Sequence, residues 1–164
     1  MALEYTTAYL LLGGNLGDRA ANLQLAIALL DERAGKVSAK SSLYETAAWG
    51  KTDQPAFLNQ AIALKTSLSA LDLLQIALEI ELELGRIRKE RWGERLIDID
   101  IILYGSQVVD ISDTLHIPHP QMQNRKFVMQ PLAEIAPKVV HPVLKQTIVE
   151  ILENITDKLD VVRL

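Results

Sequence analysis

Apolar and polar residues alternate with two different periods along the first hundred positions, and the changes of period predict where strands and helices lie. Residues 5–12, YTTAYLLL, are typical of a strand, and the glycine-rich stretch GGNLGD after them predicts a turn. Leu23, Ile27 and Leu30 then recur at helical spacing, which predicts a helix over residues 18–34. The chain therefore begins with a strand, a turn and a helix.

The next segments extend this order. Residues 36–48 are β-like, and residues 57–66, FLNQAIALKT, alternate as a strand does. A second helix is predicted to begin at Ser69 and to end at Gly85, and a further strand is predicted at residues 96–103. The order β-α-β-β-α-β predicts an α+β, ferredoxin-like fold, with a mostly antiparallel sheet and its helices on one face.

The rest of the chain, from Tyr104 on, is divided by prolines and carries only short helical patterns, near residues 128–136 and 145–153. We expect this part to form a C-terminal extension of the core. The 164 residues are 49% hydrophobic, which suits one compact domain spanning residues 1–164.

Composition removes several classes of function. The chain lacks cysteine, so disulfides and thiolate metal sites are excluded. Its net charge of −4 disfavours a general nucleic-acid binder, which is usually basic. No apolar run is long enough to span a membrane, and no basic segment precedes the apolar run at the N-terminus. We therefore expect a cytoplasmic protein with no membrane partner.

One short segment departs from the acidic balance. Residues 86–95 carry five basic side chains and two acidic ones, namely Arg86, Arg88, Lys89, Arg91 and Arg95 against Glu90 and Glu94. A local basic segment on an acidic protein indicates a small anionic ligand rather than a polymer.

Two acids interrupt the aliphatic stretch ERLIDIDIIL. Asp98 and Asp100 share one face of the predicted strand, while Ile97, Ile99 and Ile101 share the other. The strand rise puts the two acidic residues roughly 6.6–6.8 Å apart at their backbones. A divalent cation such as Mg²⁺, or a pair of such ions, would relieve their repulsion. The residues alone leave open a second interpretation, in which both acids pair with nearby arginines.

The arginines ahead of these acids favour chemistry on phosphates. Arg91 and Arg95 precede the pair, and cations that converge with a metal site are what phosphoryl transfer requires. No G-x-x-x-x-G-K-[ST] motif occurs in the chain, which excludes a P-loop nucleotide site.

Four segments resemble the 6-hydroxymethyl-7,8-dihydropterin pyrophosphokinases of folate synthesis. They are GGNLGD at 13–18, DQPAFLNQA at 53–61, GRIRKERWGERLIDIDII at 85–102 and IPHPQMQNRKFVMQPL at 117–132. The resemblance covers nearly the whole chain, and the third segment is the family's specific signature. It implies a ferredoxin-like fold, as the element order does. It also implies transfer of pyrophosphate from ATP to the hydroxymethyl group of the pterin, with Mg²⁺ and release of AMP.

The resemblance also implies roles for single residues. The metal pair, with two Mg²⁺ ions expected, is Asp98 and Asp100, which count as catalytic together with Arg86 and Arg95. The residues expected to contact ATP are Arg86, Trp92, Arg95, His119 and Arg125. Those expected to contact the pterin are Thr46, Trp49, Phe57, Asn59 and Phe127, with the two phenylalanines on opposite faces of the ring. Glu81 matches a family carboxylate beside the site, and its role is left open.

Two other classes of function stay open on the residues alone. A binding or regulatory module of the same shape would use the two aspartates in a structural ion pair. A nucleic-acid binder would expose aromatic residues with basic neighbours on the sheet, and the acidic balance argues against it. If the chain is an enzyme, we expect a monomer whose nucleophile is the substrate's own hydroxyl. No cysteine is present, and no Ser or Thr lies in a motif with a base.

Overall fold

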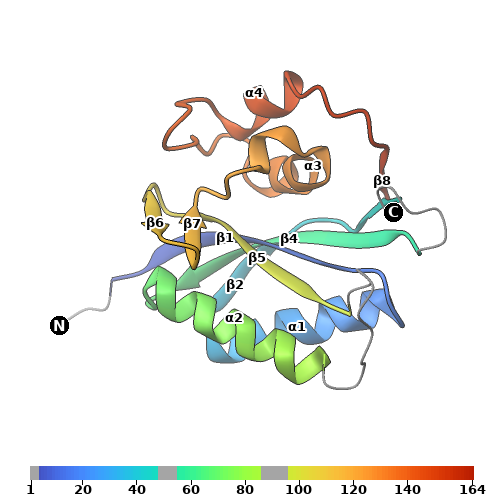
Figure 1. Cartoon of the computed structure of the whole chain (residues 1–164), viewed down its shortest axis with the longest axis vertical. Coiled ribbons are helices and arrows are strands. Elements are labelled where there is room, and N and C mark those ends of the chain that lie inside the picture. Colours follow the sequence, from blue (N-terminus) through green and yellow to red (C-terminus); the bar gives the residue numbers. More distant parts are fainter. Residues whose placement is uncertain (1–3, 48–54, 86–95) are drawn as a thin grey trace.

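The computed structural model describes residues 4–47, 55–85 and 96–164, and Figure 1 shows its layers of helices and strands. The elements are, in order, β1 (Thr6–Gly14), α1 (Arg19–Arg33), β2 (Lys36–Lys40), β3 (Tyr44–Thr46), β4 (Phe57–Thr66), α2 (Ala70–Gly85), β5 (Asp98–Tyr104), β6 (Val109–Ile111), β7 (Leu115–Ile117), a 3₁₀ turn (Met122–Asn124), α3 (Lys126–Ile135), α4 (Ile148–Glu153) and β8 (Val161–Arg163). None of the helices in these described ranges is long and apolar enough to cross a membrane.

The central sheet has the strand order β5-β1-β4-β3-β8, and β2 also pairs with β4. Every pairing within it is antiparallel. The strands β6 and β7 form a separate antiparallel hairpin. The predicted ferredoxin-like order and the antiparallel sheet are confirmed.

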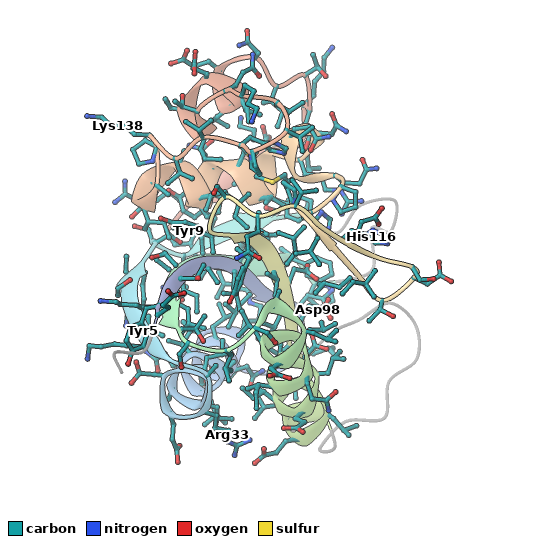
Figure 2. All side chains as sticks on the ribbon, turned by 90° about the vertical axis from the view of Figure 1, so that its left-hand side faces the viewer. Tyr5, Tyr9, Arg33, Asp98, His116 and Lys138 are labelled. Atoms are coloured by element: carbon teal, nitrogen blue, oxygen red, sulfur yellow. The ribbon has the colours of Figure 1, made fainter. Side chains whose placement is uncertain are left out.

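Helices cover the sheet from two sides. Figure 2 views the layers from the side: α1 and α2 pack against one face of the sheet, and α3 and α4 of the C-terminal extension lie over the other. Each side has its own hydrophobic core, one centred on Leu10, Leu64 and Ile80 and the other on Ile102 and Met129. The two helices of the predicted ferredoxin-like core share one face as expected, and the extension supplies the layer opposite them.

The first helix begins where the sequence predicts because a side chain caps it. Asp18 accepts a hydrogen bond from the Ala21 N–H at 3.1 Å and satisfies a backbone donor that the helix leaves free. Ahead of α2, the Ser69 hydroxyl accepts a hydrogen bond from the Asp72 N–H at 3.1 Å in the same way. The glycine-rich stretch between β1 and α1 is thus a strand-to-helix turn.

Within the stretch predicted as β-like, residues 36–48, the structure describes two short strands, β2 and β3, with a break between them. Ser41 lies in the break, and its hydroxyl accepts a hydrogen bond from the Ala61 N–H at 2.9 Å. Because this side chain takes the place of a backbone partner, the strand pairing is interrupted. The break lets β3 run on towards Thr46, at the end of the sheet where the pocket lies.

Candidate active site

A cavity of about 260 Å³ lies between the sheet and α3. Because side chains alternate along a strand, every second residue of the central strands faces it. From the sheet it is lined by Leu11, Gly13, Phe57, Asn59, Asp98, Asp100 and Ile102. Residues later in the chain, among them His119, Arg125, Phe127 and Leu159, close the other side. Its volume lies just below the roughly 300–1,000 Å³ that is typical of small-molecule sites.

Asp98 and Asp100 both line this cavity from β5. On the opposite face, Ile99 and Ile101 of that strand and Ile97 just before it are buried in the core. The predicted division of the two faces is confirmed. Glu81 of α2 accepts a hydrogen bond from the Ile99 N–H at 2.6 Å, between the two aspartates. This carboxylate therefore fixes the backbone that presents the acidic pair.

The surroundings of Asp100 disfavour the ionised form of its carboxyl group. Its side chain is exposed to the open cavity, but the protein around it displaces part of its hydration and raises the pKa of this carboxyl. The positive charge of Arg125 acts in the opposite direction and lowers that pKa. A cation beside Asp100 would add to the effect of Arg125.

His119 is placed as a neutral hydrogen-bond donor. Burial lowers its pKa, and the nearby charge of Arg125 lowers it further. Its Nδ1 accepts a hydrogen bond from the Gln121 N–H at 3.2 Å. In a neutral imidazole the proton then lies on Nε2, which can donate to a ligand oxygen.

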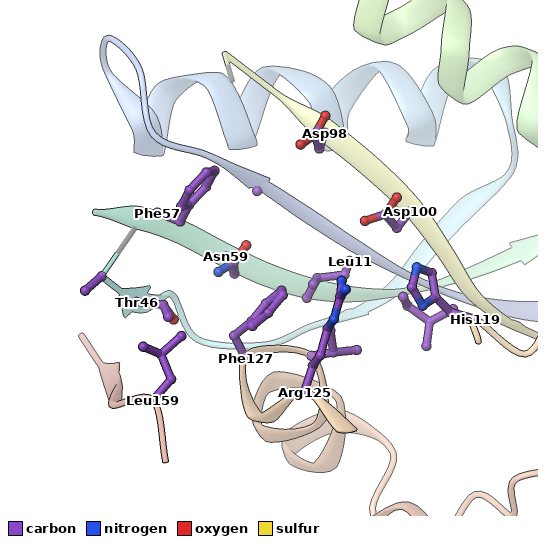
Figure 3. Close-up of a pocket in the computed structure, with 14 residues that line it drawn as sticks. Leu11, Thr46, Phe57, Asn59, Asp98, Asp100, His119, Arg125, Phe127 and Leu159 are labelled. Carbon is purple, nitrogen blue, oxygen red and sulfur yellow. The ribbon is translucent and has the colours of Figure 1, made fainter. Parts of the chain in front are cut away.

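Two aromatic rings enter the cavity from different elements. Figure 3 shows Phe57 reaching in from β4 and Phe127 from the start of α3, with Asn59 also on β4. Phe57 is positioned from the β1–α1 turn, because the residues just before it are held there. The Asn15 amide donates to the Pro55 carbonyl at 3.1 Å, and Arg19 donates to the Ala56 carbonyl at 2.9 Å.

Gly13 is a site residue that sequence reasoning missed. It pairs with Asn59 on one side and with Asp98 on the other. A Cβ atom at this position would lie 2.1 Å from the Asn59 Oδ1 atom, far inside van der Waals contact. Only glycine therefore lets the buried Asn59 amide adopt this position. The sequence signal was the double glycine at the end of the first strand.

Thr46 provides a buried polar atom that has no hydrogen-bond partner among the described residues. Its hydroxyl lines the cavity and makes no hydrogen bond within the part of the chain that the structure describes. Since buried polar groups are normally hydrogen-bonded, this hydroxyl is suited to a ligand with a polar edge.

Most of the predicted site residues line this one cavity, namely Thr46, Phe57, Asn59, Asp98, Asp100, His119, Arg125 and Phe127. The predictions for Trp49, Arg86, Trp92 and Arg95 lie outside the described residues.

Known proteins match the chain over most of its length. The family model described as 7,8-dihydro-6-hydroxymethylpterin-pyrophosphokinase (HPPK) matches residues 9–137. A relative from Methylorubrum extorquens, named 2-amino-4-hydroxy-6-hydroxymethyldihydropteridine pyrophosphokinase, is 50% identical over 137 residues, covering 82% of this chain and 85% of its own. A relative of the same name from Bacillus subtilis is 47% identical over 133 residues, covering 80% of this chain and 79% of its own.

Solved structures support the fold. The crystal structure of wild-type Plasmodium falciparum HPPK-DHPS with pteroate superposes with a TM-score of 0.71 at 18% identity and covers 93% of this chain. The match spans 43% of that longer protein, less than half of its length. This likeness supports the ferredoxin-like fold, and the sequence relatives support the assignment to a family. The chain belongs to the 7,8-dihydro-6-hydroxymethylpterin-pyrophosphokinase family.

Proposed function

We propose that this chain transfers pyrophosphate from ATP to the hydroxymethyl group of 6-hydroxymethyl-7,8-dihydropterin, giving the pterin diphosphate and AMP. One observation carries the proposal: a single cavity combines an aromatic end with a second end lined by two carboxylates, a histidine and an arginine. Membership of the family supports the same reaction. We further propose that the enzyme acts in folate synthesis, in the cytoplasm, as a monomer whose residues 1–164 form a single domain.

The aromatic end suits the pterin ring. Phe57 and Phe127 offer two flat faces for stacking, and such contacts contribute about 0.5–1.5 kcal/mol each beyond burial. The Asn59 amide can both donate and accept, and the Thr46 hydroxyl can do the same. These groups match the alternating donors and acceptors along the edge of a pterin.

The acidic end suits a hard divalent cation. Asp98 and Asp100 supply oxygen ligands, and Mg²⁺ takes the remaining ones from water and substrate phosphates. No cluster of three or more metal-binding side chains occurs in the described ranges, which fits a cation that is completed by ATP. We propose that these two aspartates hold Mg²⁺, as two ions. When bound, the metal would neutralise phosphate charge and align the reacting groups.

The protein's own contribution is positioning and charge. The aromatic pair aims the pterin hydroxymethyl oxygen at the β-phosphorus of ATP. A new O–P bond forms there, the bond from phosphorus to the α–β bridging oxygen breaks, and AMP leaves while the hydroxyl loses its proton. His119 donates a hydrogen bond to phosphate from Nε2, and Arg125 contributes positive charge. The predicted roles of Arg86 and Arg95 on the AMP side remain part of this proposal.

The direct test is product analysis. The purified chain, incubated with ATP, Mg²⁺ and the pterin alcohol, should form AMP and the pterin diphosphate in equal amounts. With a chiral β-phosphorus, a single displacement should invert the configuration. Formation of ADP instead of AMP, retention of configuration, or a phosphorylated His119 peptide from ATP alone would refute the proposal.

A second expected result concerns the aromatic pair. Phe127→Ala should weaken pterin binding roughly tenfold, because it loses both stacking and buried area. Affinity for an ATP analogue should change little, and isothermal titration calorimetry can measure both. The matched variant Phe127→Leu keeps most of the apolar volume and should lose less. Equal weakening of both ligands would indicate a general loss of structure rather than a lost stacking contact.

A further inference from the structure

The C-terminal segment, residues 155–164, reaches the cavity from a part of the chain that the family model, which ends at residue 137, does not match. Figure 1 shows it running from α4 to the edge of the sheet, where β8 pairs with β3. The register places Val161 opposite Thr46. The segment is thus fixed along the strand that brings Thr46 to the cavity.

Asp157 of this segment caps α3. The Lys126 N–H donates to one carboxylate oxygen of Asp157 at 3.0 Å, and the Leu159 N–H donates to the other at 3.0 Å. Arg125, the residue at the N-cap position of α3, makes no capping bond with its own side chain. The helix therefore takes its acceptor from a residue 31 positions further along the chain. A carboxylate also interacts favourably with the positive end of a helix.

The capped end of α3 carries two side chains of the cavity. Phe127 is the second residue of the helix, directly after the capped Lys126. Its ring lines the cavity, and the Arg125 guanidinium lies 5.9 Å from the centre of that ring. A shift in the first turn of α3 would move both side chains relative to the sheet.

Leu159 is itself a wall of the cavity. Figure 3 shows its side chain near Thr46, on the side of the cavity opposite β5. It is half-buried and lies two residues after the capping carboxylate, whose bond to the Leu159 N–H fixes the local turn. An apolar side chain here limits the room at the Thr46 end of the cavity.

We propose that Asp157 and Leu159, in the C-terminal segment 155–164, belong to the pterin-binding site. Leu159 contacts the ring and determines which substituents fit at that end, and Asp157 is a positioning residue that sets Phe127 through the cap on α3. The inference rests on the proposed function, since it assigns these residues to the pterin and not to ATP. It predicts a larger change in the KM for the pterin than in the KM for ATP.

Steady-state kinetics on four single variants test it. Leu159→Ala and Asp157→Ala are the test pair, and Leu164→Ala and Asp160→Ala are matched controls at exposed positions of the same segment. Asp157→Ala should raise the KM for the pterin about fivefold, because loss of the cap destabilises the turn that carries Phe127. Leu159→Ala should raise it roughly tenfold. The kcat should stay within about twofold in all four. The KM for ATP should stay within about twofold in Leu159→Ala and in both controls, and in Asp157→Ala, which also moves Arg125, it should rise less than the KM for the pterin.

The cap has an independent readout and a conservative variant. Hydrogen exchange at the Lys126 amide should speed up in Asp157→Ala and not in Asp160→Ala. Asp157→Asn keeps one acceptor oxygen and should give an intermediate pterin KM. Equal rises in both KM values would overturn the inference, as would faster Lys126 exchange with an unchanged pterin KM. If the unaltered chain turns over no pterin, the proposed function itself is refuted, which distinguishes the two failures.

Discussion

Asp98→Asn and Asp100→Asn should each lower kcat by about three orders of magnitude or more while the fold persists. Both carboxylates line the cavity from one face of β5, and the proposed Mg²⁺ depends on them. Loss of the charge stabilisation and alignment that a metal supplies amounts to several kcal/mol in the transition state. The measurement is AMP formation at saturating ATP and pterin over a range of Mg²⁺ concentrations.

The control for this result is Asp113→Asn, which removes an exposed carboxylate elsewhere in the chain and should leave turnover unchanged. Thermal unfolding provides a second check. Folding raises the pKa of Asp100. The folded state therefore loses stability as the pH rises through that pKa and the side chain ionises. Without metal at neutral pH, Asp100→Asn should therefore melt no lower than the unaltered chain. Full activity of Asp98→Asn at ordinary Mg²⁺ would contradict the metal assignment.

Gly13→Ala should weaken pterin binding roughly 100-fold, the effect of displacing a buried hydrogen-bonding group from its ligand. The added methyl would lie 2.1 Å from the Asn59 Oδ1 atom, so the amide must turn away from its place in the cavity. Binding of an ATP analogue should be affected far less. Calorimetry with the pterin and with the analogue separates the two effects.

Two comparisons make this prediction specific. Gly85→Ala is the matched control, because a Cβ atom there meets nothing within 4 Å in the described structure. If Gly13→Ala acts through Asn59, adding it to Asn59→Ala should weaken pterin binding little further. Additive effects in the double variant would show that the glycine matters for another reason, such as the pairing of β1 with its neighbours.

The elements that sequence reasoning located correctly have local signals. β4 has clear alternation, and α1 and α2 combine helical periodicity with capping residues. The structure places all three within a few residues of the prediction. The aspartate pair was also predictable, because alternation along a strand assigns both acids to one face whatever surrounds them.

Other features depend on residues far apart in the sequence. The break in the stretch 36–48 comes from a side-chain bond between Ser41 and Ala61, which no local pattern indicates. β8 has three residues and exists through its pairing with β3. The role of Gly13 likewise becomes evident only when Asn59 lies opposite it. Such constraints arise from tertiary contacts, and a single sequence does not display them.

The short strand β8 also decides what the sheet presents to other molecules. A bare strand edge is a template on which a second chain can pair and aggregate. With β8 in place, β3 has a partner on each side, and this part of the edge ends in a strand of only three residues. The rest of that edge is β2, a strand of five residues with a lysine at each end. At the far edge, β5 carries Asp98 and Asp100, whose charges oppose pairing with another strand. β8 and the two aspartates, which help to build the cavity, thus also disfavour edge-to-edge pairing at these two places.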